Sequence, residues 1–320
     1  MIGVAGSGAF GTALAIALGR ADHEVRLWAR DAGQVARMQA DGQNAARLPG
    51  AAFPESVSAT AKIQDLTGAE AVLLAVPMQS LGGFLTDHAA ALEGSALVAC
   101  CKGVDLHRLQ GASALIGAAC PGAIVAVLTG PSFAADIARG LPTALTLACK
   151  GDAAGERLQH LLSTPVLRLY RTSDVVGAEL GGALKNVIAI AAGVVMGAGL
   201  GDSARAALMT RGYAEMQRLA LHLGARPETL AGLSGLGDLV LTCTSTQSRN
   251  LRFGMALGAG QVPESGVTVE GAATALAVVR LAGQAGIDMP ITKMVAALIA
   301  GQIPLDQAIR SLMSRPLKQE

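Results

Sequence analysis

Charged residues are scarce in this chain. Only 15% of its 320 residues are Asp, Glu, Lys or Arg, and 25 basic residues nearly balance 24 acidic ones, which leaves a net charge of +1. A chain with this balance has no general field that would attract nucleic acid or an anionic membrane. The hydrophobic content of 51% argues against disorder, and the length fits one large domain or two of medium size.

Patterned cysteines and histidines are also missing. The five cysteines form no C-x-x-C pair and are odd in number, which is typical of buried thiols in a reducing cytoplasm and excludes a disulfide framework or a zinc site. The five histidines lie in unrelated contexts, and no Ser/His/Asp order or metal-ligand spacing predicts hydrolysis or metal catalysis. The residues concerned are Cys100, Cys101, Cys120, Cys149 and Cys243, and His23, His88, His107, His160 and His222.

The chain also lacks a clear membrane-directing segment. The first strand is expected at Ile2, so no secretory signal precedes the fold. The most apolar stretch runs from Val187 to Gly201 and is shorter than the roughly 20 residues that a bilayer span requires. We expect a buried helix followed by a loop there, in a soluble cytoplasmic protein.

The first half of the sequence has the pattern of alternating strands and helices that is typical of a doubly wound α/β domain. Short runs, most of them continuously apolar, alternate with helical stretches, as expected for strands buried on both faces of a largely parallel sheet. Such alternation predicts a Rossmann-type domain over residues 1–173. The expected strands are residues 2–5, 24–29, 71–76, 96–101, 123–128, 143–149 and 166–170.

The rhythm changes near Asp174. Long Ala/Leu/Val-rich segments with helical spacing follow, and they predict an all-α domain over residues 174–320. No Pro/Ser-rich linker separates the two parts, so we expect the boundary in a helix that leaves the first domain. The apolar helices fit either the core of this domain or the face of a homodimer.

A glycine loop follows the first expected strand. Gly6, Gly8 and Gly11 have the spacing G-x-G-x-x-G and open a helix. In this position Gly6 permits a tight turn, Gly8 lets the backbone approach a pyrophosphate, and Gly11 allows close helix packing, while the helix N-terminus supplies free N–H groups. The loop by itself is a weak motif, but its place in the first turn of the sheet favours a dinucleotide site.

The choice of dinucleotide depends on the end of the second strand. NAD enzymes usually carry an acidic residue there, whereas this strand ends at Ala29 and is followed by Arg30. Asp31 lies further on and is expected to cap a helix. Arg30 is either a solvated surface residue or a partner for a 2′-phosphate. The second interpretation favours NADP(H), with NAD(H) as the alternative.

Two polar sites follow later strands. Lys102 comes after the fourth expected strand, at the sheet edge where open α/β sheets bind ligands. Gly130 and Pro131 form a turn after the fifth, and Ser132 is positioned to cap the helix that follows.

Lys185 interrupts the apolar segment ELGGALKNVIAIAAG, in which no polar face is evident. A buried ammonium group is costly and has a lowered pKa, so it can act as an acid or base near neutral pH. We therefore predict Lys185 as the catalytic residue.

Phosphate-binding chemistry appears further along. Ser248, Arg249 and Asn250 together suit a phosphate, because guanidinium binds phosphate in a bidentate manner and its neighbours add hydrogen bonds. Asp238 is a candidate partner for Lys185 or an anchor for a substrate hydroxyl. These residues predict a small anionic substrate.

The order of these motifs resembles the bacterial-type NAD(P)-dependent glycerol-3-phosphate dehydrogenases. The resemblance rests on GSGAFGTALA, CKGVD, GPSFA, GGALKNVIAIAAG, GLGDLVLTCTSTQSRNLRFG and VEGAATA, and it extends over nearly the whole chain. It implies a Rossmann domain followed by a helical domain. The implied reaction is reversible hydride transfer between NAD(P)H and dihydroxyacetone phosphate, which gives sn-glycerol 3-phosphate for phospholipid synthesis.

The resemblance also implies roles for individual residues. Lys185 matches the proton donor and acceptor of the family. The matching substrate contacts are Lys102, Gly130, Ser132, Asp238, Ser248, Arg249 and Asn250, and the matching cofactor contacts are Phe10, Arg30, Lys102, Ala134, Arg249 and Glu270. Two alternatives stay open: a related dehydrogenase of 2- or 3-hydroxy acids, and a non-catalytic dinucleotide sensor.

Overall fold

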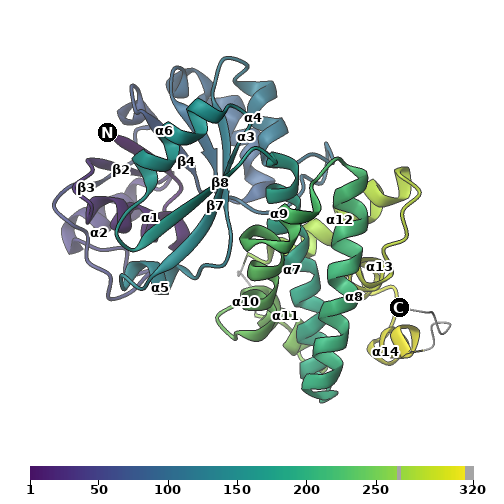
Figure 1. Cartoon of the computed structure of the whole chain (residues 1–320). Helices are drawn as coiled ribbons and strands as arrows, with labels where there is room; N and C mark the ends of the chain where they lie inside the picture. Colours follow the sequence, from purple (N-terminus) through teal and green to yellow (C-terminus); the bar gives the residue numbers. More distant parts are fainter. Residues whose placement is uncertain (265–267, 314–320) are drawn as a thin grey trace.

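The computed structural model describes residues 1–264 and 268–313, and it begins with an eight-stranded sheet flanked by helices (Figure 1). The strand order is β3-β2-β1-β4-β5-β6-β7-β8, and every neighbouring pair is parallel except β6 and β7. The strands are β1 (Ile2–Ala5), β2 (Val25–Trp28), β3 (Val57–Thr60), β4 (Ala71–Leu74), β5 (Ala96–Ala99), β6 (Val125–Thr129), β7 (Thr143–Cys149) and β8 (Leu167–Thr172). The predicted doubly wound α/β fold is confirmed.

Six α-helices belong to the sheet region. They are α1 (Ala9–Gly19), α2 (Ala32–Asp41), α3 (Met78–His88), α4 (Ala112–Ala119), α5 (Ala134–Ala138) and α6 (Asp152–Leu162), with short 3₁₀ helices η1 (Ile63–Leu66) and η2 (Ala89–Leu92). Separate apolar clusters form on the two faces of the sheet, and β1 and β4 are buried along their whole length. Continuous apolar strands are the expected result of burial on both faces.

One strand was not expected from the sequence. β3 has the sequence VSAT, in which only two of four residues are apolar, and it pairs with β2 alone at the edge of the sheet. Three of its four residues are buried, but Ser58 and Thr60 interrupt the apolar pattern, so its sequence signal is weak.

After β8 the described chain is helical, with no strand in residues 174–264 or 268–313. Asp174 caps α7 by accepting a hydrogen bond of 2.8 Å from the Gly177 amide. The helices are α7 (Val175–Gly197), α8 (Gly201–His222), α9 (Pro227–Ala231), the π-helical turn η3 (Leu233–Gly237), α10 (Asp238–Thr244), α11 (Arg249–Gly258), α12 (Glu270–Gln284), α13 (Pro290–Ile299) and α14 (Leu305–Met313). Figure 1 shows this helical part beside the sheet.

Helix α7 is the centre of the helical part. It has 23 residues and is long and apolar enough, by length and composition alone, to cross a membrane. The expected buried helix followed by a loop at Val187–Gly201 agrees with the structure, in which α7 begins at Val175 and ends at Gly197. The expected burial is confirmed: 89% of its most apolar window lies inside the protein, as in the core helix of a soluble domain.

Glycines let α11 pack directly on α7. A Cβ atom at Gly254 would lie 2.0 Å from the Ile190 carbonyl oxygen, and one at Gly193 would lie 2.2 Å from the Leu251 carbonyl oxygen. The two helix backbones are thus in contact, and α11 begins where α7 carries Lys185 and Asn186. This packing brings the N-terminus of α11 to the middle of α7.

We expect Gly254→Ala to lower the free energy of unfolding by about 1–3 kcal/mol, the usual cost of overpacking a close contact. The added methyl group would meet backbone atoms, which cannot swing aside. The midpoint of denaturant unfolding measures the effect. Gly283→Ala in α12 is the matched control, because a Cβ there meets nothing within 4 Å and alanine should add about 0.5–1 kcal/mol. Equal effects of both changes would contradict the close-packing argument.

Candidate active site

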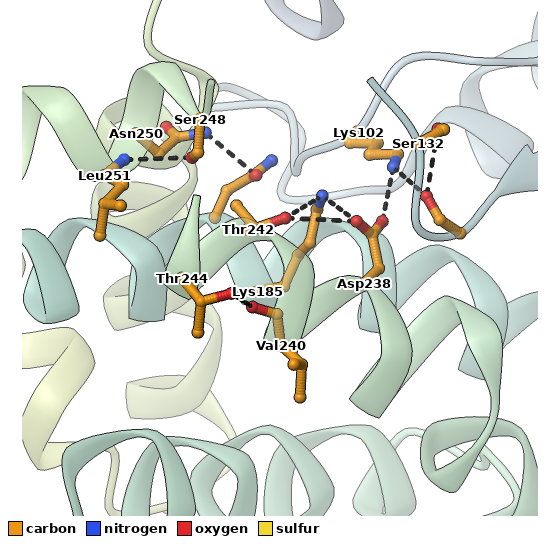
Figure 2. Close-up of polar contacts among 12 residues, drawn as sticks. Lys102, Ser132, Lys185, Asp238, Val240, Thr242, Thr244, Ser248, Asn250 and Leu251 are labelled. Carbon is orange, nitrogen blue, oxygen red and sulfur yellow. Dashed lines mark hydrogen bonds and ion pairs between the residues drawn. The ribbon is translucent and has the colours of Figure 1, made fainter. Parts of the chain in front are cut away.

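A buried ion-pair network lies where the sheet meets the helical part. Lys185 of α7 is only 6% exposed, and Asp238 at the start of α10 is fully buried. The Lys185 Nζ donates to Asp238 Oδ1 and, at 2.7 Å, to Thr242 Oγ1. Lys102, beyond β5, donates to Asp238 Oδ2 at 2.6 Å (Figure 2). One carboxylate therefore bridges two lysines that come from different parts of the fold.

The same network includes the loop after β6. The Lys102 Nζ also donates to the Gly130 carbonyl oxygen at 3.1 Å, and Ser132 Oγ donates to that oxygen at 3.3 Å. The predicted capping role of Ser132 is wrong: α5 begins one residue later, with Phe133 at its N-cap position and no side-chain cap. Because Ser132 and Lys102 donate to the same carbonyl oxygen, that of Gly130, the two side chains lie next to each other.

Burial decides the titration of Lys185. Removal from water lowers its pKa from 10.5 to about 8, since the ammonium form loses its hydration. The charge of Asp238 opposes this shift, and the positive charge of Lys102 adds to it. With a pKa near neutrality the amine can both donate and accept a proton in the physiological range.

Glycines before Lys185 allow the close approach of its partners. A Cβ at Gly182 would lie 2.5 Å from Thr129 Oγ1, at the carboxyl end of β6, and 3.6 Å from Lys102 Cγ. A side chain at this position would push the sheet edge away from α7. Gly182 therefore lets the Rossmann-type sheet bring Lys102 to Asp238.

The N-terminus of α11 forms the next part of the site. Ser248 caps the helix by accepting a hydrogen bond from the Leu251 amide at 3.2 Å (Figure 2). The Asn250 Nδ2 donates to Asn186 Oδ1 at 3.0 Å, which joins α11 to the residue after Lys185. Arg249 is exposed at the first position of the helix. A helix N-terminus that carries an exposed guanidinium group suits a phosphate.

Glu270 lies at the start of α12, next to the N-terminus of α11, where the Gly271 amide donates to Asn250 Oδ1 at 3.0 Å. The Glu270 Oε1 accepts a long hydrogen bond of 3.4 Å from the Met78 amide, at the N-terminus of α3. Burial raises the pKa of the carboxyl group, and the charge of Arg249 opposes the shift. The side chain therefore connects the two parts of the molecule near Arg249.

The glycine loop has the shape that a dinucleotide site needs. Gly6 has φ +116°, and a Cβ there would lie 2.7 Å from the Ala75 carbonyl group. A Cβ at Gly11 would lie 2.0 Å from the Gly6 carbonyl oxygen, whereas the exposed Gly8 has nothing within 4 Å. Backbone atoms thus pack against the loop at Gly6 and Gly11, whereas the space next to Gly8, in front of the α1 N-terminus, is empty. This arrangement fits a pyrophosphate.

The remaining predicted cofactor residues surround this loop. Phe10 and Ala134 pack against the same small apolar cluster between α1 and α5. Arg30 is exposed just beyond β2, whose Trp28 is paired with Ala5 of β1, so it lies at the same sheet edge as Gly6. Asp31 caps α2 by accepting from the Gln34 amide, as expected. The structure does not bring Arg30 to the lysine network, because β2 and β5 are separated by β1 and β4.

Two functional candidates were missed in the sequence. The Asn44 Nδ2 donates at 2.8 Å both to the Ser7 carbonyl oxygen and to Thr12 Oγ1, and Asn44 is 1% exposed. Thr242 lies one helical turn after Asp238 and donates to its carboxylate at 3.2 Å. Asn44 lies in a polar segment without periodicity, so no pattern singled it out, whereas the spacing of Asp238 and Thr242 at i and i+4 was a usable signal.

Several curated proteins that match this chain over its whole length carry the same name. The family model of the NAD-dependent glycerol-3-phosphate dehydrogenase N-terminus matches residues 1–154, and that of the C-terminus matches residues 174–310. A protein of Cereibacter sphaeroides named glycerol-3-phosphate dehydrogenase [NAD(P)+] is 68% identical over 320 residues, with 100% of both chains covered. A Paracoccus denitrificans protein of the same name is 60% identical and covers 100% of this chain and 99% of its own.

A solved structure extends the comparison to three dimensions. Glycerol-3-phosphate dehydrogenase from Coxiella burnetii superimposes with a TM-score of 0.94 at 37% identity, and 98% of each chain is covered. The match includes both the Rossmann-type and the helical part. The chain belongs to the NAD-dependent glycerol-3-phosphate dehydrogenase family.

Proposed function

We propose that this chain catalyses the reversible reduction of dihydroxyacetone phosphate to sn-glycerol 3-phosphate with NADPH or NADH. The observation that carries the proposal is the buried Lys185, held by Asp238 beside the exposed α11 N-terminus. This combination offers a proton for a carbonyl oxygen and a binding site for a phosphate. Relatives that match the whole chain carry the corresponding name.

The cofactor fits the glycine loop. Open space at Gly8 and the free amides of α1 would hold the pyrophosphate, with Phe10 and Ala134 nearby. Glu270 would contact the cofactor from the start of α12, beside Met78 and Arg249. Arg30 would contact a 2′-phosphate, which is why we propose NADP(H) as the favoured cofactor and NAD(H) as the alternative. When bound, the nicotinamide supplies or accepts the hydride.

The protein's own residues then handle the proton and the substrate. The Lys185 ammonium group donates a proton from Nζ to the ketone oxygen during reduction, and its neutral form accepts that proton in the reverse direction. Asp238 and Thr242 hold the amine in place. We assign Arg249, Asn250 and Ser248 to the substrate phosphate, and Lys102, Gly130 and Ser132 to the substrate end next to Asp238.

The wider assignments follow from this activity. We propose a dinucleotide-binding domain at residues 1–173 and a substrate and catalytic domain at residues 174–320. The product suits glycerophospholipid synthesis, and a cytoplasmic location suits both the cofactor and the free thiols. A homodimer stays a prediction that sedimentation analysis would test.

A direct assay tests the proposal. Purified protein is mixed with dihydroxyacetone phosphate and either NADPH or NADH, and oxidation of the reduced nicotinamide is followed by its absorbance. We expect oxidation that depends on dihydroxyacetone phosphate. A panel of 2-keto and 3-keto acids is the control, and faster turnover of any of them would point to a hydroxy-acid dehydrogenase instead. Absence of turnover with every substrate, despite NADPH binding, would support a dinucleotide sensor.

Asn44→Ala should lower the affinity for NADPH by up to about 30-fold, with little change in kcat at saturating cofactor. The substitution removes both hydrogen bonds to the glycine loop, each contributing roughly 1 kcal/mol. Fluorescence titration with NADPH measures the change. Gln43→Ala is the neighbouring control, because Gln43 bonds to Gly50 and not to the loop. If both variants bind NADPH equally, Asn44 does not shape the site.

A further inference from the structure

A π-helical turn precedes the carboxylate of the site. In η3 the Gly237 amide donates to the Gly232 carbonyl oxygen at 3.1 Å, five residues back, and Asp238 follows directly as the first residue of α10. The π-helix is rare, and its single turns are frequently found at functional sites. The position of this turn therefore controls where the Asp238 carboxylate lies.

Gly181 of α7 lies directly against the π turn. A Cβ at Gly181 would be 2.6 Å from the Ser234 carbonyl oxygen and 3.0 Å from its carbonyl carbon. The opposing atoms belong to the backbone, so no side chain can swing aside. On the other side of the turn, a Cβ at Gly235 would lie 1.9 Å from the Leu230 carbonyl oxygen. The turn thus packs between α7 and α9 so closely that neither Gly181 nor Gly235 could carry a side chain without moving backbone atoms.

The contact between Gly181 and Ser234 and the ion pair between Lys185 and Asp238 are four residues apart on each of the two segments. Lys185 follows Gly181 by four residues, and Asp238 follows Ser234 by four residues. Residues at i and i+4 lie on one face of a helix. The backbone contact of Gly181 with Ser234 is therefore one helical turn away from the ion pair of Lys185 with Asp238.

We propose that Gly181 is a positioning residue for the proton-transfer site: by allowing the π turn to touch α7, it sets the separation of Lys185 and Asp238. The proposal rests on the proposed function. With alanine at position 181, the Ser234 oxygen has to retreat by about 0.8 Å, from 2.6 Å to the 3.4 Å of ordinary contact. Asp238 moves with the turn, and its bonds to Lys185 and Lys102 lengthen.

A longer ion pair changes the titration of Lys185. The groups that face its ammonium are Asp238 and Thr242 of α10 and Lys102 beyond β5. Cys243 of α10 is also within electrostatic reach, but burial raises its pKa to about 12 and keeps it neutral. Because Asp238 is the group that opposes the lowering by burial, its retreat lowers the Lys185 pKa further.

The test compares Gly181→Ala with Gly197→Ala. Position 197 lies on the same helix, and a Cβ there would be 2.1 Å from the Met255 carbonyl oxygen, but it is 12 residues, or about 18 Å, from Lys185. Both variants should lose stability. Only Gly181→Ala should lower kcat for dihydroxyacetone phosphate about tenfold or more, with unchanged NADPH affinity, and shift the high-pH limb of kcat/KM to lower pH. NMR titration of the Lys185 side-chain nitrogen should show the same shift without turnover.

The outcomes separate the two proposals. If the wild-type protein does not reduce dihydroxyacetone phosphate, the proposed function fails, while the NMR titration still tests the positioning role. If Gly181→Ala has the stability loss of Gly197→Ala but keeps the wild-type kcat and Lys185 pKa, Gly181 is only a packing residue. Should Gly181→Ala not fold, Gly235→Ala displaces the turn from the other side and is judged by the same two measurements.

Discussion

Lys185→Ala is expected to lower kcat by at least 100-fold, and KM for dihydroxyacetone phosphate should change much less. Positioned acid–base groups contribute about 10²–10⁴-fold to rates, and 100-fold corresponds to roughly 2.7 kcal/mol of barrier. The fold should survive the change, because Asp238 keeps its ion pair with Lys102 at 2.6 Å. Steady-state kinetics with NADPH, together with thermal unfolding, measure both effects.

Controls define what result would contradict this role. Lys150→Ala removes an exposed lysine and should leave kcat unchanged. If Lys185→Ala turned over within threefold of the wild type, which is only about 0.7 kcal/mol of barrier, another group would have to supply the proton.

The pH dependence gives an independent check on Lys185. Its pKa is lowered to about 8, so the ammonium form prevails below that pH and the amine above it. Ketone reduction needs the ammonium form and should decline as pH rises through about 8, whereas alcohol oxidation needs the amine and should rise. In Lys185→Ala both limbs should disappear from the kcat/KM profiles. Persistence of either limb would assign it to another residue.

The sequence predicted those strands of the sheet whose burial requires a run of mostly apolar residues. Six of the eight strands are continuous or nearly continuous apolar runs, and β8 alternates apolar and polar residues; all seven were expected. β3 was missed because Ser58 and Thr60 interrupt its apolar pattern. The start of α7 was not predicted, since its first turns, with Glu179 and three glycines, carry no continuous apolar signal.

Local patterns predicted the candidate site better than they predicted its contacts. Lys185 was singled out because no polar face surrounds it, and its burial is confirmed. Asp238 had two possible roles, and the structure shows it as the partner of both lysines. Ser132 was expected to cap a helix, but α5 has Phe133 at its N-cap position and the Ser132 hydroxyl donates to the Gly130 carbonyl oxygen instead. Contacts between residues 50 or more positions apart depend on packing that no local pattern contains.

The close approach of helix backbones explains why the sequence did not predict the long-range contacts of the site. Gly181, Gly182, Gly193 and Gly254 all lie where a Cβ atom would meet neighbouring backbone or side-chain atoms within about 2.6 Å. In the sequence they are four of 40 glycines, and nothing distinguishes them from glycines in exposed turns. Their role is evident only from the element that packs against them, because a glycine at the contact lets this element lie closer than any residue with a Cβ atom would allow.

Arg249→Ala should raise KM for dihydroxyacetone phosphate about 10- to 100-fold, with a smaller effect on kcat. A hydrogen bond to a charged group contributes roughly 1.5–3 kcal/mol, and each 1.4 kcal/mol corresponds to a factor of ten in affinity. The guanidinium group is exposed at the N-terminus of α11, where the helix dipole also favours an anion. Initial rates over a range of substrate concentrations, at saturating NADPH, measure the change.

The phosphate itself provides the control for this prediction. Dihydroxyacetone lacks the phosphate, so its weak turnover should be the same in Arg249→Ala and in the wild type. Arg249→Lys should be intermediate, because lysine keeps the charge but not the bidentate geometry. The resemblance also implies a cofactor contact for Arg249, which NADPH titration of the variant would reveal as a separate loss of affinity. An unchanged KM for dihydroxyacetone phosphate would place the phosphate elsewhere, and Lys102, which shares Asp238 with Lys185, would then be the next cation to test.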